Sequence, residues 1–273
     1  HQDLIMGGGD ALALLNPIAS DLGVMRRGLL PGLLGAAAFN LKRQQAQVRL
    51  FEIGRVFRVE QGRIQQPLLV AGICFGNNYP EQWDIDKLSG DFYDIKNDVE
   101  AVLGAVGIRP DLRWQPAMQP GLHPGQHAEI LVKDQIIGYV SSIHPRVLGA
   151  MDLPGPMRVF ELNAEHIPQR CEPRFRPLSR FPSLRRDLAI VVDQDLPVQR
   201  VLDAAAAAAG EVLTNLELFD VYQGEGIDLG KKSLALGLTF QVTSSTLTDE
   251  AVDSVINTVL AVLREEFGAT LRE

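Results

Sequence analysis

Cysteines and long apolar runs are both scarce in this sequence of 273 residues. Its two cysteines, Cys74 and Cys171, are too few for a disulfide scaffold or a multi-cysteine zinc site, and their scarcity indicates a reducing cytoplasm. No apolar run approaches the ~20 residues that a membrane-spanning helix needs, which excludes a helical membrane protein. The chain begins His1-Gln2-Asp3 without an initiator methionine or a signal-peptide pattern, so we expect a fragment of a longer protein. The remaining composition, 46% hydrophobic and 22% charged, is typical of a globular protein of about two domains.

The sequence also lacks an excess of basic residues: it has 26 Lys and Arg and 34 Asp and Glu, which gives a net charge of −8. This balance argues against broad electrostatic binding of nucleic acid. The charge is distributed unevenly: residues 1–169 carry −3, residues 170–186 carry six Arg against one Glu, and residues 187–273 carry −10. Prolines in the basic stretch favour an extended linker over residues 170–180, between domains at 1–169 and 181–273. This stretch is either a solvated connector or an electrostatic arm that contacts phosphates.

The C-terminal block carries the clearest periodic pattern. Period-two runs predict strands at 187–192, 213–222, 232–241 and 269–272. Apolar residues at helical spacing predict one helix that follows Pro197 and ends at Gly210, and a second helix from about Thr248 to Gly268. The resulting β-α-β-β-α-β order predicts a ferredoxin-like sandwich with both helices on one face of the sheet.

Strand alternation predicts what the other face of this sheet offers. The residues expected to meet the helices are Leu188, Ile190, Val192, Leu234, Leu236, Leu238 and Phe240. If Phe219 and Val221 also point inward, the open face holds small or polar residues and one aromatic: Ala189, Asp220, Tyr222 and Ser233. A single-stranded RNA base could stack on Tyr222 and donate a hydrogen bond to Asp220. The pattern taken alone favours a simpler alternative, in which Tyr222 only packs at the end of its strand.

The first 169 residues predict a mostly antiparallel α+β sheet domain, because strands outnumber helices without a regular βαβ alternation. The expected strands are 47–57, 68–75, 127–132, 136–143 and 158–163. Helices are expected at 31–43 and 94–103. Phe57–Glu60 is expected to close the first strand rather than to start a second hairpin, and His144-Pro145 is expected to form a turn.

No segment carries a recognisable catalytic or metal-binding constellation. Gly7-Gly8-Gly9 is not followed by Gly-Lys-Ser/Thr and is therefore no P-loop. His123 and His127 are four residues apart, but Pro124-Gly125 breaks any helix that would align them on a metal. Ser141-Ser142 lacks a nucleophile elbow. The acidic residues at 91, 94 and 98 are expected to cap a helix start, so we expect no catalytic residue and no metal ligand.

Six longer motifs follow one another in a family order: NPIASDLGVMRRGLLPGLL, NLKRQQAQVRLFEIGRVF, GDFYDIKNDVEAVL, LHPGQHAEI, IGYVSSIHPRV and FPSLRRDLAIVV. This set resembles the C-terminal half of the bacterial phenylalanyl-tRNA synthetase β subunit, from about Asn16 to Glu273. The resemblance implies a catalytically inactive class II synthetase-like domain followed by a ferredoxin-like anticodon-binding domain. The residues agree with inactivity, because they lack the phosphate-gripping Arg and the Gly-rich segment ending in Arg that class II chemistry needs.

For the first domain, the resemblance implies packing against the catalytic α subunit. The helix that starts at Pro31 and the strand after it correspond to the class II dimerisation motif. The implied interface residues are Arg26, Arg27, Leu30, Pro31 and Leu33.

For the second domain, the resemblance implies binding of the anticodon stem-loop of phenylalanine tRNA. The family positions that contact the first anticodon base fall on Ala189, Asp220, Tyr222 and Ser233. Further phosphate partners are Arg185, Arg186, Lys231 and Lys232. Because the domain carries −10, we expect recognition by stacking and hydrogen bonding, with a modest dependence on salt.

The complete enzyme implied by the resemblance is a cytoplasmic α2β2 phenylalanine–tRNA ligase that uses ATP and Mg²⁺. This chain is expected to be a non-catalytic part of that enzyme, with no cofactor of its own and no membrane or DNA partner. The alternative from another class is a metabolite-sensing regulatory protein, since ferredoxin-like domains also pair to bind small ligands.

Overall fold

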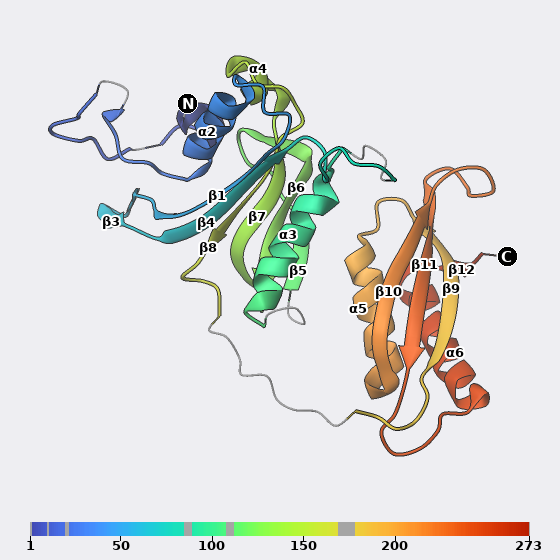
Figure 1. The fold of residues 1–273 in the computed structure, drawn as a ribbon. Coiled ribbons are helices and arrows are strands. Elements are labelled where there is room, and N and C mark those ends of the chain that lie inside the picture. The colour runs from blue at the N-terminus through green and yellow to red at the C-terminus, as the bar shows by residue number, and fades with distance from the viewer. Residues whose placement is uncertain are drawn as a thin grey trace. The chain divides into compact units, whose positions relative to one another are not determined.

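The computed structural model describes residues 2–9, 11–19, 22–84, 89–107, 112–168 and 178–272. The chain divides into two compact units, residues 1–173 and residues 174–273 (Figure 1). Most of the predicted linker, residues 170–177, lies outside the described residues. No helix in the described ranges is both long enough and apolar enough to cross a membrane.

The first unit is built on a six-stranded antiparallel sheet in the order β1-β4-β8-β7-β6-β5. Its strands are β1 (Val48–Arg55), β4 (Leu68–Phe75), β5 (Leu112–Pro116), β6 (Leu122–Val132), β7 (Gln135–Ile143) and β8 (Arg158–Asn163). Its helices are α1 (Gln2–Met6), α2 (Leu30–Leu41), α3 (Phe92–Ala105) and α4 (Pro145–Ala150). A separate hairpin pairs β2 (Arg58–Glu60) with β3 (Arg63–Gln65).

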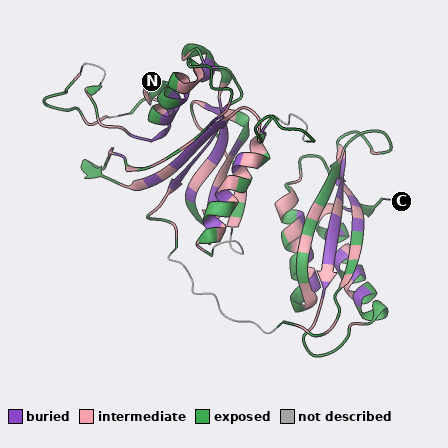
Figure 2. Cartoon of the chain, in the orientation of Figure 1, coloured by how far each residue is buried: buried purple, intermediate pink, exposed green. Residues whose placement is uncertain are grey.

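Two apolar cores lie on the sheet of the first unit, and buried residues follow its strands in Figure 2. Side chains of α2 such as Leu30 and Leu34 join one core, whereas Ile95 and Val99 of α3 join the other. Strand β4 contributes to both cores because successive side chains point to opposite faces. The mixed, antiparallel α/β class expected for this region is confirmed.

Two local expectations in the first unit were wrong. Phe57–Glu60 does not close β1, which ends at Arg55. Arg58–Glu60 instead forms β2, the first strand of a second hairpin whose turn residues Gln61 and Gly62 have φ of 51° and 74°. His144-Pro145 is not a simple turn but the start of α4, where the ring nitrogen Nδ1 of His144 accepts the Arg146 backbone N–H at 3.0 Å. In contrast, Asp91 caps α3 as expected, since its carboxylate accepts the backbone N–H groups of Tyr93 and Asp94.

A buried carboxylate holds the start of α2. The side chain of Glu161 on β8 is 5% exposed and accepts the backbone N–H of Leu29 at 2.9 Å. Arg58 on β2 lies 3.8 Å from the other carboxylate oxygen. Burial raises the pKa of Glu161, while the hydrogen bond from Leu29 and the charge of Arg58 oppose that rise. The start of α2 and Arg58 therefore offset part of the cost of burying this carboxylate.

The second unit follows the predicted β-α-β-β-α-β order. Its elements are β9 (Leu184–Asp193), α5 (Val198–Ala209), a short 3₁₀ turn (Gly210–Val212), β10 (Leu213–Tyr222), β11 (Lys231–Phe240), α6 (Asp249–Phe267) and β12 (Thr270–Leu271). The sheet is antiparallel in the order β10-β11-β9-β12. Thr248 caps α6 through its hydroxyl, and Gly268 ends this helix with φ 63°.

The core of the second unit lies between its sheet and its two helices. The predicted inward residues of β11, namely Leu234, Leu236, Leu238 and Phe240, are all 0% exposed. The predicted inward residues of β9, namely Leu188, Ile190 and Val192, are also buried. The opposite face of the sheet is therefore left to the alternate residues of each strand.

Glu161→Gln should change how the stability of the first unit depends on pH. Because folding raises the pKa of Glu161 above its ordinary value of about 4.5, the folded state holds the proton more tightly than the unfolded state. The free energy of unfolding that this group contributes therefore falls as pH rises above 4.5 and levels off above the folded pKa. Glutamine does not titrate, so the variant should gain stability relative to the wild type as pH rises from about 4 to about 7.

Denaturant unfolding followed by tryptophan fluorescence measures this difference, because Trp83 and Trp114 both lie in the first unit. Glu165→Gln, which removes a half-exposed carboxylate from an ion pair with Arg55, is the control. A constant difference between wild type and Glu161→Gln across this pH range contradicts the prediction.

Candidate nucleic-acid interface

The open face of the second sheet brings four predicted residues together in two neighbouring rows. Asp220 on β10 lies opposite Ala235 on β11, which lies opposite Ala189 on β9. In the next row, Tyr222 lies opposite Ser233. We call these five residues the platform. Adjacent strands are about 4.8 Å apart, so the platform is about the size of one nucleotide base and its surroundings.

The register of β10 explains why Asp220 and Tyr222 share this face. A bulge between Leu218 and Asp220 inserts Phe219 as an extra residue opposite β11. Val221 pairs with Leu234 and so shares its side of the sheet, but at 46% exposure it lies outside the core. Phe219 does not point inward: it is 52% exposed, and its ring lies 5.6 Å from the guanidinium carbon of Arg185. The inward placement expected for Phe219 was therefore wrong, since alternation does not anticipate a bulge.

Tyr222 stands at the end of β10, and neighbouring groups fix its ring. Its hydroxyl donates a hydrogen bond to the Glu225 carbonyl oxygen at 3.1 Å, which ties the ring to the following loop. The guanidinium carbon of Arg272 lies 4.8 Å from the centre of the ring. Ser233 beside it is only 3% exposed. Ser233 thus forms the floor of the platform.

Two of the four predicted phosphate partners lie on the helix face instead of the open face. Arg186 pairs with Asp249 and Asp253 of α6. Lys232 is 9% exposed and donates from Nζ to the Leu196 carbonyl oxygen at 2.7 Å. Burial lowers the pKa of Lys232. Each follows a cation of the open face, Arg185 or Lys231, and successive side chains of a strand point to opposite faces.

The two remaining cations share the open face but stand at different ends of it. Lys231 is two residues from Ser233 along β11. Arg185 lies opposite Thr239, six residues from Ser233, or about 20 Å along the strand. Its guanidinium also pairs with the carboxylates of Asp187 at 2.8 Å and Glu217 at 3.8 Å. Lys231 therefore stands next to the Ser233 end of the platform. The guanidinium of Arg185 lies over Gly237, two residues from Ala235, and is engaged by these carboxylates.

The implied subunit-interface residues of the first unit mostly serve that unit itself. Leu30 and Leu33 are 2% and 4% exposed in its core. Arg27 is 8% exposed, pairs with Asp3 and donates to the Gly7 carbonyl oxygen at 3.1 Å. These three residues are therefore unavailable as an exposed contact surface, because inward packing uses them. Pro31 is half-buried, and Arg26 pairs with Glu52 of β1.

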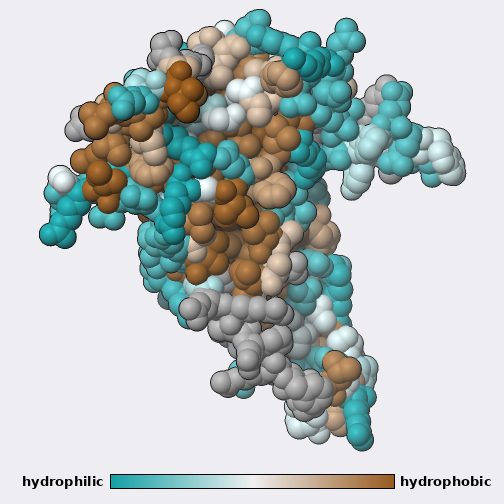
Figure 3. Space-filling model, turned by 60° about the vertical axis from the view of Figure 1, so that its left-hand side comes forward, coloured by the Kyte–Doolittle hydropathy of each residue, from teal (hydrophilic) through white to brown (hydrophobic). Residues whose placement is uncertain are grey.

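The exposed side of α2 carries other residues, which sequence reasoning missed. They recur at helical spacing and are small except for one aromatic: Gly32, Gly35, Ala36 and Phe39. Phe39 is 56% exposed. More apolar surface appears on the first unit in Figure 3, and on β1 the side chains of Phe51 and Ile53 are 75% and 59% exposed. The sequence carries only a weak signal for this division, because α2 is apolar or small on nearly every side.

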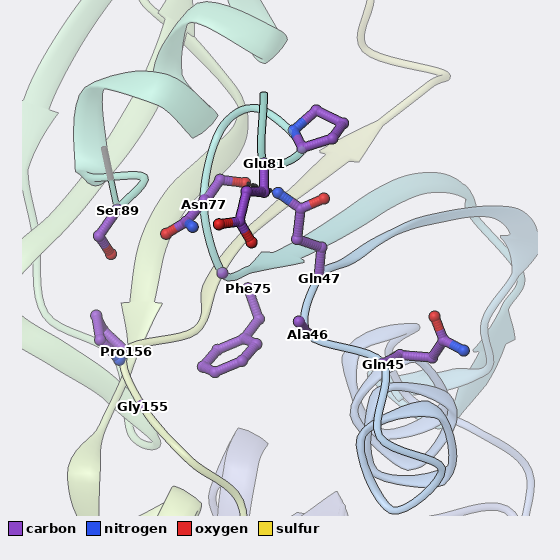
Figure 4. Close-up of a pocket in the computed structure, with 11 residues that line it drawn as sticks. Gln45, Ala46, Gln47, Phe75, Asn77, Glu81, Ser89, Gly155 and Pro156 are labelled. Carbon is purple, nitrogen blue, oxygen red and sulfur yellow. Dashed lines mark hydrogen bonds between the residues drawn. The ribbon is translucent and has the colours of Figure 1, made fainter. Parts of the chain in front are cut away.

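A hollow of about 690 Å³ in the first unit is lined by polar side chains, among them the carboxylate of Glu81 and the hydroxyl of Ser89 (Figure 4). Side-chain amides such as those of Gln47 and Asn77 line it, together with Phe75. The Gln47 amide is already engaged, donating to the carbonyl oxygens of Asn77 and Tyr79 at 2.8 Å each. Across the residues that the structure describes, no group of three or more His, Cys, Asp or Glu side chains could hold a metal ion.

Comparisons with known proteins agree with this division of the chain. A family model described as "Phenylalanyl tRNA synthetase beta chain CLM domain" matches residues 2–164, and one described as "Ferredoxin-fold anticodon binding domain" matches residues 179–272. The chain is 48% identical over 261 residues to the phenylalanine–tRNA ligase beta subunit of Methylococcus capsulatus, covering 96% of this chain and 33% of that protein. It is 45% identical over 272 residues to the same subunit of Pseudomonas fluorescens, covering 99% and 34%. The chain thus spans about a third of the length of these curated relatives, whose names match the synthetase prediction over the metabolite-sensing alternative.

Tyr222→Phe should loosen the loop after β10 without disturbing the platform. The change keeps the ring and its contact with Arg272 but removes the hydrogen bond to Glu225. Loss of one hydrogen bond of this kind should make amide exchange by local opening roughly 2- to 10-fold faster. Hydrogen–deuterium exchange of residues 223–230 measures the effect, with Tyr93→Phe, at an exposed position of the first unit, as the control. Unchanged exchange in this loop contradicts the prediction.

Proposed function

Because this chain belongs to the family of phenylalanyl-tRNA synthetase β chains, we propose that its second unit binds the anticodon stem-loop of phenylalanine tRNA. The platform is the observation that carries this proposal. Its floor of small side chains leaves room for a flat base, and its rim supplies one aromatic ring and one carboxylate. In this proposal, the first anticodon base stacks on Tyr222 and donates a hydrogen bond to Asp220.

The charges of the second unit favour recognition of a base over general attraction to the phosphate backbone. Residues 187–273 carry a net charge of −10, and the guanidinium groups of Arg185 and Arg186 face carboxylates of their own chain. Lys231 is therefore the cation of the predicted set that the proposal assigns to a phosphate near the platform. Binding that depends on so few phosphate contacts has a modest salt dependence.

For the first unit, we infer a class II synthetase-like fold that carries no active site and packs against the catalytic α subunit. Arg58, the nearest match to the arginine that grips ATP phosphates in class II enzymes, supports inactivity. It donates to the Arg27 carbonyl oxygen at 3.2 Å and lies beside Glu161, so contacts within the unit engage it. Support for a contact surface comes from the exposed side of α2, where small residues permit close approach of another helix beside Phe39. This side of α2 replaces Leu30 and Leu33 in the proposed interface.

The complete enzyme in this proposal is a cytoplasmic α2β2 phenylalanine–tRNA ligase, and this chain corresponds to the C-terminal part of its β subunit. ATP and Mg²⁺ would serve the catalytic α subunit and not the residues described here. The two units of this chain then contribute anticodon binding and subunit assembly to a reaction that takes place elsewhere in the complex.

Tyr222→Ala should weaken binding of phenylalanine tRNA by the assembled enzyme by about 1–3 kcal/mol, the usual loss for one stacked base. Tyr222→Phe keeps the stacking surface and should bind nearly as the wild type does. Fluorescence titration of labelled tRNA into the α-containing enzyme measures both. Equal affinities for wild type and Tyr222→Ala would rule out the platform as the base site.

Lys231→Gln should lower the slope of log Kd against log salt by about 0.7, the amount for one contact to a single-stranded phosphate. The matched control is its neighbour, Lys232→Met, because the ammonium of Lys232 lies on the helix face and its stem is buried. The same titration, repeated at several salt concentrations, gives both slopes. Equal slopes for the two variants contradict the assignment of Lys231.

A further inference from the structure

We propose that Arg272 is a further tRNA-contacting residue, whose guanidinium rests on the Tyr222 ring in the free protein and closes over the bound base when tRNA arrives. The proposal rests on the anticodon-binding function inferred above. Sequence reasoning placed Arg272 at the end of a last strand without giving it a register or a partner.

The backbone of Arg272 is anchored beside the platform. Strand β12 pairs with β9 so that Thr270 lies opposite Val191 and Leu271 opposite Ile190. One residue further, the backbone N–H of Arg272 donates to the Ala189 carbonyl oxygen at 2.9 Å. Side chains opposite each other in a ladder share a face, so Arg272 takes the face of Ala189, which is the open one.

The side chain of Arg272 crosses the platform to reach Tyr222. β12 and β10 are the two outer strands of this sheet, about 14 Å apart, with β9 and β11 between them. The guanidinium carbon nevertheless lies 4.8 Å from the centre of the Tyr222 ring. Such a path over the sheet needs small residues beneath it, and Ala189 and Ala235 supply them in the same row.

A base that uses this platform must take the place of the guanidinium. In the free protein, the guanidinium covers the ring on which we propose that the base stacks. An exposed cation–π contact is weak, whereas base stacking on an aromatic ring is among the larger contributions to single-strand binding. Replacing the guanidinium by a base on the Tyr222 ring is therefore favourable. Because the backbone of Arg272 is anchored, its displaced guanidinium stays within one side-chain length of the base.

Arginine suits this second position because of its charge and shape. A planar guanidinium stacks on a base and also pairs with a phosphate through parallel N–H groups, which an ammonium does not do. Arg272 would place a positive charge at the site, whereas residues 187–273 as a whole carry a net charge of −10. The proposed site thus holds the base between Tyr222 below and Arg272 above.

The test compares Arg272→Gln and Arg272→Lys with the wild type in the assembled enzyme containing the α subunit. Titration of labelled phenylalanine tRNA at several salt concentrations gives the affinity and the salt slope of each. Loss of one phosphate contact corresponds to about fivefold weaker binding at 0.1 M salt and a slope lower by about 0.7. We expect both changes in Arg272→Gln, and in Arg272→Lys a restored slope with only partly restored affinity.

The outcomes separate this proposal from the one it rests on. If Tyr222→Ala weakens binding while Arg272→Gln binds as tightly as the wild type or more tightly, the Arg272 contact is overturned and the platform stands. If neither variant weakens binding, the anticodon site itself is overturned. Arg272 is exposed, and Arg272→Lys preserves its charge, so loss of folding does not explain a difference between the two variants.

Discussion

The side-chain alternation of β11 is the constraint on which the second unit depends. This strand is flanked by β10 and β9, so its inward residues must fill the space under the helices, and Leu234, Leu236, Leu238 and Phe240 do so without any exposure. A slip of one residue in register would exchange the two faces and place these large side chains in water. The same constraint leaves Ser233 and Ala235 on the other face. Core and platform are therefore two results of one pattern.

The acidic character of the second unit determines what kind of contact with RNA is physically reasonable. Most cations described near this sheet are engaged by nearby groups, since Arg185 faces Asp187 and Arg186 faces α6. General attraction to phosphates is thus weak, and a few oriented groups must supply the affinity. In the proposed site, Tyr222, Asp220 and Arg272 would provide stacking, hydrogen bonding and one positive charge within a small area.

The first unit uses its charged side chains for its own architecture. Glu161 satisfies the start of α2 from a buried position, and Arg27 ties the N-terminal segment to the same region. Hydrogen bonds offset part of the cost of burying these groups, although Nε of Arg27 has no hydrogen-bond partner among the described residues. These arginines and carboxylates hold α2 in place, and the side of α2 that carries small residues stays exposed.

Periodicity within the sequence predicted the longer strands and helices of the first unit but not α1, β2, β3, β5 or α4. For the second unit it predicted the order of the elements and the inward residues of the central strands. It also determined that Asp220 and Tyr222 share a face, because period-two alternation is a local property. Three things followed only from the tertiary structure: the bulge that turns Phe219 outward, the return of the last strand beside β9, and the burial of Leu30 and Leu33 in the core of their own unit. These depend on pairing between residues far apart in sequence, so no local pattern carries them. For that reason the sequence identified the ring on which a base is proposed to stack, whereas only the fold brought Arg272 onto it.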